Sequence, residues 1–361
     1  MLAPDPVAFA NTLLTWYERH HRALPWRETR DPYAIWLSEI ILQQTRVSQG
    51  LPYYLDFIAA YPTVQDLAAA PPDEVLRHWQ GLGYYSRARN MHQTAKYITV
   101  ECHGIFPNTY KGLLQLKGIG PYTAAAIASF AFKEKVAVVD GNVYRVLARV
   151  FGLAEDTASP TGKKAFQLLA DSLISVDQPD TYNQAIMEFG AIQCTPNMPD
   201  CLFCPLQQGC YAFQHGLVQV LPHKTKAKAS RTRYFHYLVF KHEQTYYLKK
   251  RTESDVWQGL YDFYLLPNDT EPALAIEIIK QELAGFHPPL DYTIIIEPHK
   301  TYKRILSHQK ILAKFYLIPL KSRLSDEVLQ NMGLAAYSYE EIEQLPKAVL
   351  ISDYLQDAIK K

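Results

Sequence analysis

The four cysteines between residues 194 and 210 constrain this chain more than any other feature of its sequence. Their spacing is Cys194-x6-Cys201-x2-Cys204-x5-Cys210, and Cys102 stands apart from them. Four thiolates on one short segment are the ligand set of a 4Fe-4S cluster, so the spacing predicts such a cluster. Structural zinc is the alternative, although zinc sites usually pair two short knuckles and only one occurs here. Disulfides are less favoured, because no signal peptide is evident and cytosolic thiols stay reduced.

The overall composition is that of a globular protein. The chain has 361 residues, which is enough for two or three domains, and no apolar run is long enough to cross a bilayer. Its 37 Lys and Arg residues balance 36 Asp and Glu residues. Attraction to a polyanion must therefore come from local patches rather than from net charge. We expect a cytoplasmic protein, associated with the nucleoid if it is bacterial, with no membrane partner.

The spacing of apolar residues changes near residue 222, which predicts two domains joined by a linker. Residues 1–221 have helical spacing throughout, so they are predicted to form an all-α domain. Residues 222–233 carry three Lys and two Arg without an acid, which is typical of an exposed basic linker. Residues 234–361 contain short runs rich in Tyr, Phe, Ile and Val, which predict an α+β domain.

The predicted helices of the first domain are 6–21, 33–48, 51–60, 73–79, 86–101, 109–117, 121–132, 141–151 and 161–175. The predicted strands of the last domain are 234–240, 245–250, 261–266, 292–297 and 311–318, with helices near 272–284 and 352–360.

Two short motifs at helix starts combine a structural role with a chemical one. The turn at Gly118 and Gly120 precedes a helix that starts at Pro121, so its amides could bind a phosphate. Taken without its context, the motif is more often a plain helix-helix turn. Asp140 ends an apolar run before another helix, where it could be an N-cap. A carboxylate held ionised there by amides and the helix dipole could also stabilise a nearby cation.

Glu39 lies in an unusually apolar predicted helix. It shares a helix face with Ile35, Trp36 and Leu42. Burial among such neighbours raises the pKa of a carboxyl group, which would make Glu39 a general acid near neutral pH. A partly exposed helix glutamate is the alternative interpretation.

Together these residues resemble the helix-hairpin-helix DNA glycosylases, and more closely the adenine glycosylases of the MutY family. The resemblance covers nearly the whole chain. Its motifs, in order, are Pro25-Trp26-Arg27, Ser38-Glu39, Gln43-Gln44-Thr45-Arg46, residues 81–87, the helix-hairpin-helix turn at residues 116–123, residues 139–143, residues 183–185 and the four cysteines. The family implies a monofunctional, monomeric enzyme that hydrolyses the glycosidic bond of adenine paired with 8-oxoguanine, or with G, in double-stranded DNA.

The resemblance also implies roles for individual residues. Glu39 would protonate adenine, and Asp140 would face the sugar cation with support from Tyr122 and Asn142. Protonating the base requires a carboxyl group with a high pKa, and stabilising the sugar cation requires one with a low pKa. Trp26, Arg27 and Gln184 would line the adenine pocket. The residues that contact DNA would be Gln43, Gln44, Thr45, Arg46, Leu82, Tyr84, Arg87, Gly118 and Gly120.

The same resemblance assigns the C-terminal domain, residues 234–361, to a Nudix-like fold that recognises 8-oxoguanine. The recognition loop would be Leu306-Ser307-His308, in which Leu306 replaces the phenylalanine of the family's Phe-Ser-His. A Nudix nucleotide hydrolase is disfavoured, because Glu282 is the one carboxylate left where magnesium needs several.

Two further alternatives are weaker. An endonuclease III-like enzyme, which acts on oxidised pyrimidines, carries a lysine two residues after the last hairpin glycine, where this chain has Tyr122. A binding-only or iron-sulfur redox protein would leave the identities of Glu39 and Asp140 unexplained.

Overall fold

The computed structural model describes residues 5–225, 230–266, 276–306 and 309–359. The chain divides into two compact units, one of residues 1–69 and 93–227 and the other of residues 70–92 and 228–361. Among the described residues, no helix is long and apolar enough to cross a membrane.

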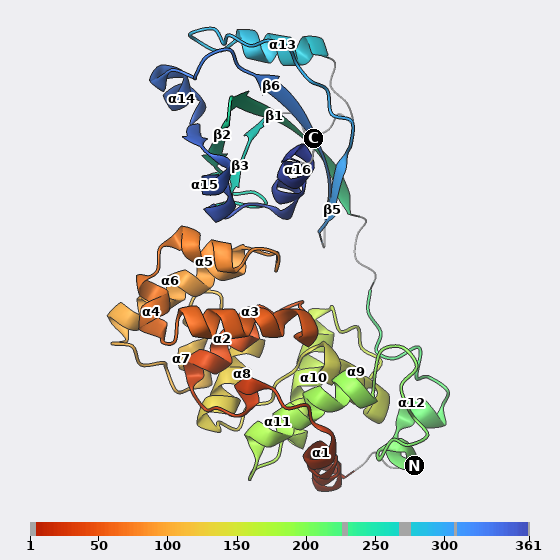
Figure 1. Ribbon diagram of the computed structural model, residues 1–361. Helices are drawn as coiled ribbons and strands as arrows, with labels where there is room; N and C mark the ends of the chain where they lie inside the picture. Colours follow the sequence, from red (N-terminus) through yellow and green to blue (C-terminus); the bar gives the residue numbers. More distant parts are fainter. Residues whose placement is uncertain (1–4, 226–229, 267–275, 307–308, 360–361) are drawn as a thin grey trace. The chain divides into compact units, whose positions relative to one another are not determined.

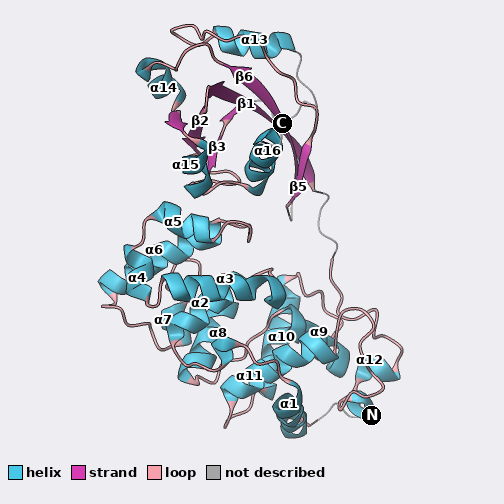
Figure 2. Cartoon of the chain, viewed as in Figure 1, coloured by secondary structure: helices cyan, strands magenta, loops and turns pink. Residues whose placement is uncertain are grey.

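Helices make up nearly all the regular structure of the first unit (Figures 1 and 2). They are α1 (Pro6–His20), η1 (Pro25–Arg27), α2 (Pro32–Leu42), α3 (Val47–Ala60), α4 (Val64–Ala69), α7 (Tyr110–Leu113), α8 (Pro121–Phe132), α9 (Gly141–Phe151), α10 (Pro160–Leu173), α11 (Pro179–Glu188), η2 (Phe189–Gln193), η3 (Gln207–Gly209) and α12 (Tyr211–Gln214). Helix α6 (Ser86–Glu101) runs from the second unit into the first. The prediction that this part of the chain is mostly helical is confirmed.

Capping residues and prolines explain where many of these helices begin. Asp5, Asp31 and Ser159 each accept a backbone N–H at a helix start, and a proline occupies the first turn of α1, α2 and α10. The predicted helix 33–48 is wrong at its end. It stops at Leu42, and Gln44 has a positive φ of 57°, which interrupts the helix before α3 starts at Val47.

Helix α2 is the central helix of the site. Nine of its residues, Tyr33 to Ile41, are buried, and it packs against α3 and α8. A second core lies where α1, α9, α10 and α11 meet, around Phe166, Tyr182 and Phe189. Burial on all sides of α2 fixes its side chains firmly, as a site on a helix requires.

The second unit contains a mixed sheet with the strand order β3-β2-β1-β6-β5. Its strands are β1 (Arg231–His242), β2 (Thr245–Lys250), β3 (Tyr261–Asp262), β4 (Tyr264–Leu265), β5 (Tyr302–Ile305), β6 (Gln309–Pro319) and β7 (Ala335–Tyr337). Strands β1 and β6 are parallel from Arg231↔Gln309 to Lys241↔Pro319, and the other pairs are antiparallel. The helices are α5 (Pro72–His78), α13 (Ile276–Ala284), α14 (Asp326–Met332), α15 (Tyr339–Gln344) and α16 (Val349–Ile359).

Alternate side chains of the central strands face two different layers of helices. Leu238 and Phe240 of β1 pack with Ile279 of α13 and Val328 of α14. On the other face, Phe315 of β6 stacks on Tyr354 of α16, with ring centroids 4.2 Å apart. The sheet is therefore covered on both faces, with α13 and α16 on opposite sides of it in Figure 1. The predicted strand 292–297 is wrong, since that segment forms only isolated bridges at Tyr292 and Ile296.

Residues 70–92 belong to the sheet-containing unit, whereas the sequence pattern placed them with the first half of the chain. Asp73 forms an ion pair with Lys250 and accepts a hydrogen bond from Tyr261. Arg89 donates to the Gln258 carbonyl at 2.6 Å. These contacts join residues far apart in sequence, which periodicity cannot reveal.

Candidate active site

The predicted catalytic and adenine-binding residues line one cavity of about 800 Å³ in the first unit. Five segments supply them: η1 carries Trp26 and Arg27, α2 carries Glu39, α8 carries Tyr122, the start of α9 carries Asp140 and Asn142, and α11 carries Gln184. The structure thus brings together residues that are up to 158 positions apart in the sequence, from Trp26 to Gln184.

Glu39 is the buried acid of this cavity. Its side chain is almost fully buried within α2. Burial raises the pKa of Glu39 to about 7, against the lowering effects of a hydrogen bond with Tyr122 and of the nearby Arg27 charge. The carboxyl group therefore keeps its proton over a wide range below neutral pH, as the sequence pattern predicted.

Asp140 is both the N-cap of α9 and a wall of the cavity. One carboxylate oxygen accepts from the backbone N–H groups of Asn142 and Val143 at 2.8 and 2.7 Å, and the other accepts from the Asn142 side chain at 2.8 Å. Burial nevertheless raises the pKa of Asp140 above its ordinary value, although these hydrogen bonds lower it. Burial therefore raises the pKa of both carboxyl groups, whereas the sequence pattern predicted that backbone amides and the helix dipole hold Asp140 ionised.

Tyr122 contacts the acid rather than the N-cap carboxylate. Its hydroxyl hydrogen-bonds with Glu39, and it interacts with Asp140 only through electrostatics. Asn142 therefore supports Asp140 directly, whereas Tyr122 supports Glu39.

Glu188 and Arg22 also line the cavity, although they are not among the residues predicted for the site. Glu188 accepts three hydrogen bonds of 2.7 Å, from Nε and Nη2 of Arg22 and from Nη2 of Arg27. Burial raises its pKa, but the two arginines outweigh burial and lower the pKa to about 2. The signal was available, because Glu188 follows Gln184 by one helical turn and so shares its face of α11.

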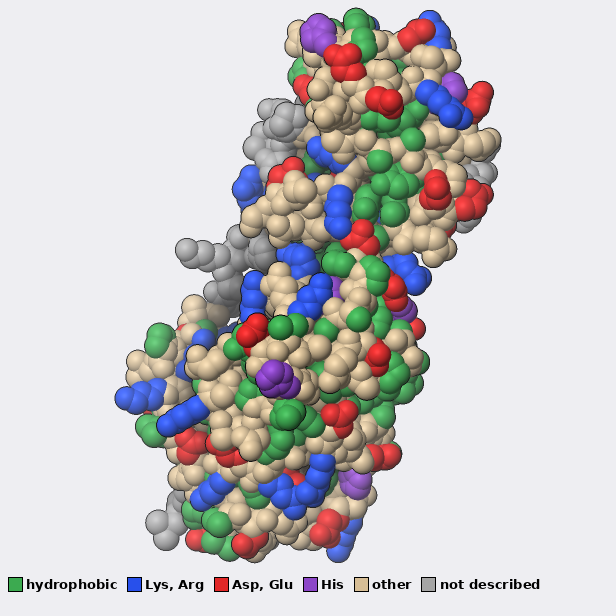
Figure 3. All heavy atoms as spheres, turned by 90° about the vertical axis from the view of Figure 1, so that its left-hand side faces the viewer, with side chains coloured by type: hydrophobic (Ala, Val, Ile, Leu, Met, Phe, Trp, Pro, Cys, Tyr) green, Lys and Arg blue, Asp and Glu red, His purple; other side chains and the backbone are tan. Residues whose placement is uncertain are grey.

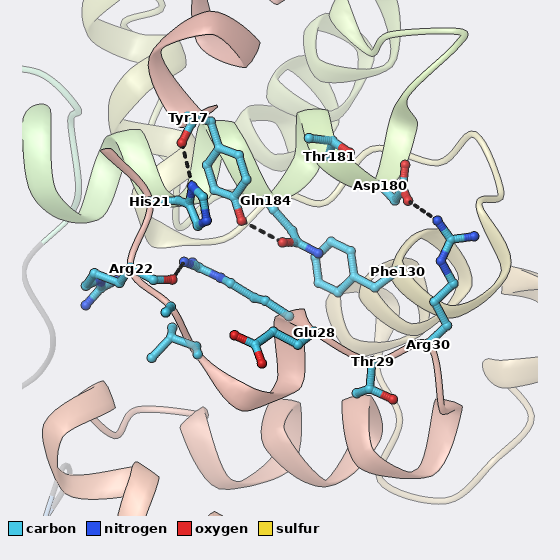
Figure 4. A pocket seen from close by; sticks show the side chains of 13 residues that line it. Tyr17, His21, Arg22, Glu28, Thr29, Arg30, Phe130, Asp180, Thr181 and Gln184 are labelled. Atoms are coloured by element: carbon cyan, nitrogen blue, oxygen red, sulfur yellow. Dashed lines mark hydrogen bonds and ion pairs between the residues drawn. The ribbon is translucent and has the colours of Figure 1, made fainter. Parts of the chain in front are cut away.

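A smaller cavity of about 270 Å³ shares lining residues with the first (Figure 4 shows the smaller one). Arg22, Leu24, Arg27, Phe130 and Gln184 line both cavities. In Figure 4 the Tyr17 hydroxyl points toward Gln184, and its oxygen lies 2.7 Å from Gln184 Oε1.

The four cysteines lie in the segment that follows η2, which ends at Gln193. Cys194, Cys204 and Cys210 pack against the core of the first unit, and Cys204 interacts electrostatically with the other three thiols. Within the described ranges, no group of three or more His, Cys, Asp or Glu residues is arranged to hold a metal ion.

Two arginines of α9, which the sequence analysis did not single out, contact the cysteine segment. Arg149 Nη1 lies 3.4 Å from Cys194 Sγ. Arg145 Nε donates to the Cys194 carbonyl at 2.7 Å, and its Nη2 donates to Asn142 Oδ1 at 2.9 Å. Asn142 thus lies between the Asp140 carboxylate and the cysteine segment.

The predicted DNA-contacting residues are divided between the two units. In the first, Thr45 and Arg46 line the large cavity, and Gln43 donates to Thr123 at 3.3 Å. Gly118 has a φ of 77°, which favours glycine, and Gly120 is the N-cap of α8. On the face drawn in Figure 3, Lys and Arg side chains are interspersed with Asp and Glu.

In the second unit, Leu82, Tyr84 and Leu306 line a cavity of about 640 Å³ together with Trp257. The Arg87 guanidinium lies over the Trp79 ring, 5.0 Å from its centroid. Ser307 and His308 lie outside the described residues.

The sequence of this chain resembles those of known proteins. Residues 37–171 match the family described as HhH-GPD superfamily base excision DNA repair protein. An adenine DNA glycosylase of Buchnera aphidicola subsp. Baizongia pistaciae is 36% identical over 270 residues, covering 73% of this chain and 76% of that protein. The adenine DNA glycosylase of Buchnera aphidicola subsp. Schizaphis graminum is 32% identical, with 88% of each chain covered.

A solved structure adds a likeness of fold. A non-covalent endonuclease III–DNA complex matches 60% of this chain and 99% of that chain, with a TM-score of 0.52. At 21% identity, this likeness concerns the fold alone. The family match, the two relatives and the carboxyl-lined cavity lead to one conclusion: the chain belongs to the adenine DNA glycosylases, base excision repair enzymes of the HhH-GPD superfamily.

Proposed function

We propose that this glycosylase removes adenine paired with 8-oxoguanine or G, with Glu39 as the general acid and Asp140 as the carboxylate that faces the sugar. The observation that carries this proposal is the meeting of both carboxyl groups in one cavity, with the pKa of buried Glu39 raised to about 7. An acid with a pKa near the working pH is both protonated and able to give up its proton.

Adenine leaves its sugar readily only when the ring is protonated and the positive charge on the sugar is stabilised. Glu39 supplies the proton, and Tyr122 holds its carboxyl group. Asp140 is fixed by three hydrogen bonds, so its charge needs little reorganisation as the sugar becomes cationic. Water then completes the hydrolysis. The target base must first leave the DNA double helix, which costs roughly a few kcal/mol.

The adenine would lie against Trp26, Arg27 and Gln184. Trp26 is held edge-on by Tyr54, with ring centroids 5.1 Å apart. Arg27 donates to Glu188 at 2.7 Å and to the Arg22 carbonyl at 2.9 Å, which fixes its guanidinium. A wall of fixed donors beside an aromatic ring suits the ring nitrogens and the flat face of a purine.

We also propose that the four cysteines hold a 4Fe-4S cluster. Thiolates are the ligands that such a cluster takes. The four thiols lie near one another, since Cys204 interacts electrostatically with the other three. The cluster would fix the segment that Arg145 joins to Asn142, and no step of the base removal requires it.

Recognition of the opposite base is assigned to the cavity around Tyr84, Trp257 and Leu306. Aromatic and aliphatic side chains there can contact the face of an 8-oxoguanine, and Ser307 and His308 are proposed to bond its edge. In this proposal residues 1–221 carry out the chemistry, residues 222–233 link the parts, and the Nudix-like residues 234–361 read the lesion.

The test is single-turnover excision on duplexes that contain one 8-oxoguanine:A pair. Asp140→Asn and Glu39→Gln should each lose at least about a hundredfold in rate, the cost typical of losing a charge-stabilising group, while mispair affinity stays near wild type. Asp31→Asn is the matched control, since it also alters a helix N-cap carboxylate but lies outside the cavity. Near wild-type excision by Asp140→Asn would overturn the assignment.

A further inference from the structure

Tyr17 contacts two proposed adenine-binding residues at once from behind the cavity wall. Its hydroxyl oxygen lies 2.7 Å from Gln184 Oε1, and the Arg27 guanidinium lies over its ring, 5.7 Å from the centroid. Tyr17 and Gln184 both line the smaller cavity, and Figure 4 shows the Tyr17 hydroxyl directed at the Gln184 side-chain amide. Tyr17 lines the smaller cavity but not the larger one, so it does not meet the base itself.

We propose that Tyr17 is a positioning residue of the adenine site, which fixes the Gln184 amide in the orientation that binds the base. The proposal rests on the proposed location of adenine. With Oε1 bonded to Tyr17, Gln184 turns its NH₂ group away from the tyrosine. The side chain then offers donors, which match the acceptor nitrogens of adenine.

The surroundings keep Tyr17 in place and its hydroxyl protonated. The side chain is buried in α1, and its ring stacks on His21 with centroids 4.7 Å apart. Burial raises the pKa of Tyr17, although the Arg27 charge lowers it, so the hydroxyl remains a donor.

Loss of the Tyr17 hydroxyl should affect the position of Gln184 more than that of Arg27. Arg27 also donates to Glu188 and to the Arg22 carbonyl, so it stays anchored when the tyrosine hydroxyl is removed. For the Gln184 side chain, the Tyr17 hydroxyl is the hydrogen-bond partner found within the described part of the chain. Removing the hydroxyl alone should therefore act through Gln184.

Tyr17→Phe tests this, because it removes the hydroxyl and keeps the ring beneath Arg27. Loss of one hydrogen bond is expected to lower the single-turnover excision rate by about two- to tenfold. The matched control is Tyr33→Phe, which removes a buried hydroxyl bonded to the Tyr61 carbonyl at 2.7 Å, away from the cavity. It should keep the wild-type rate. Equal rates for the two variants would overturn the proposal.

A double-mutant cycle separates positioning from general loosening of the fold. In the background of Gln184→Ala, Tyr17→Phe should cause no further loss of rate, because its effect passes through the missing amide. A full additional loss there would contradict the proposed route. Gln184→Ala alone reports on the adenine site: an unchanged rate in that variant would overturn the site assignment, and with it the role of Tyr17.

Discussion

At the residue scale, the burial that keeps Glu39 protonated near neutral pH also makes its ionised form costly. Its pKa of about 7 lies above the ordinary 4.5 because desolvation penalises the carboxylate. The folded state therefore holds this proton more tightly than the unfolded state does. Stability from this group is fully present below pH 4.5 and is lost as the pH rises to 7.

Glu39→Gln should reveal this cost, since glutamine does not ionise. From the two pKa values, the stability of the variant relative to wild type should rise by roughly 3 kcal/mol between pH 4 and pH 8. Denaturant unfolding at several pH values measures the difference, in which the titration of other groups cancels. A difference that does not change with pH would contradict the burial of an ionisable Glu39.

The roles of some residues in the cavity were predictable from the sequence alone, and those of others were not. Asp140 precedes a helix and follows an apolar run, so its N-cap role is visible in the sequence. The contact of Tyr122 with Glu39 depends on how α2 and α8 pack, which spacing does not encode. The raised pKa of Asp140 likewise depends on burial by distant segments.

At the element scale, helix starts were predicted best where a cap or proline marks them. Helices α8 and α9 begin at Pro121 and Gly141, as predicted, because Gly120 and Asp140 cap them. The break between α2 and α3 was predicted at residues 49–50 but lies at residues 43–46, where the turn at Gln44 contains neither glycine nor proline. Helix α11 was also missed, although it supplies Gln184.

The residue at position 122, in the first turn of α8, should determine whether the reaction ends with release of adenine or continues to strand cleavage. Tyr122 occupies the position at which a lysine would act as a Schiff-base nucleophile, so the enzyme should release adenine without efficient strand cleavage. Tyr122→Lys should add a complex with abasic DNA that borohydride traps. The measurement is a denaturing gel of the trapped product, and efficient trapping by the unmodified enzyme would contradict a purely hydrolytic reaction.

The cysteine segment between η2 and α12 should bind iron rather than zinc. Purified protein is expected to absorb broadly near 400 nm and to contain about four irons per chain. Cys204→Ser should lower both signals, because Cys204 is the thiol whose interactions reach the other three. Stoichiometric zinc without visible absorption would support the alternative four-thiolate site.

At the scale of the whole molecule, the chemistry and the reading of the opposite base are assigned to different units. Leu306→Ala should therefore change the preference for 8-oxoguanine:A over G:A while leaving slow excision from G:A intact. Loss of one base contact typically costs about 1–3 kcal/mol, so the ratio of the two excision rates should fall by at least about fivefold. An unchanged ratio would mean that Leu306 does not contact the lesion.

The position of residues 70–92 has a consequence for how this protein is made. Gln80 accepts from the Lys347 backbone N–H at 3.2 Å, and Asp73 and Arg89 also contact the C-terminal half. A ribosome adds about 5–20 residues per second, so this segment waits on the order of ten seconds or more for its partners to be synthesised. The order of synthesis and the order of packing therefore differ. A part of the chain that is synthesised later completes the packing of a part that is synthesised earlier.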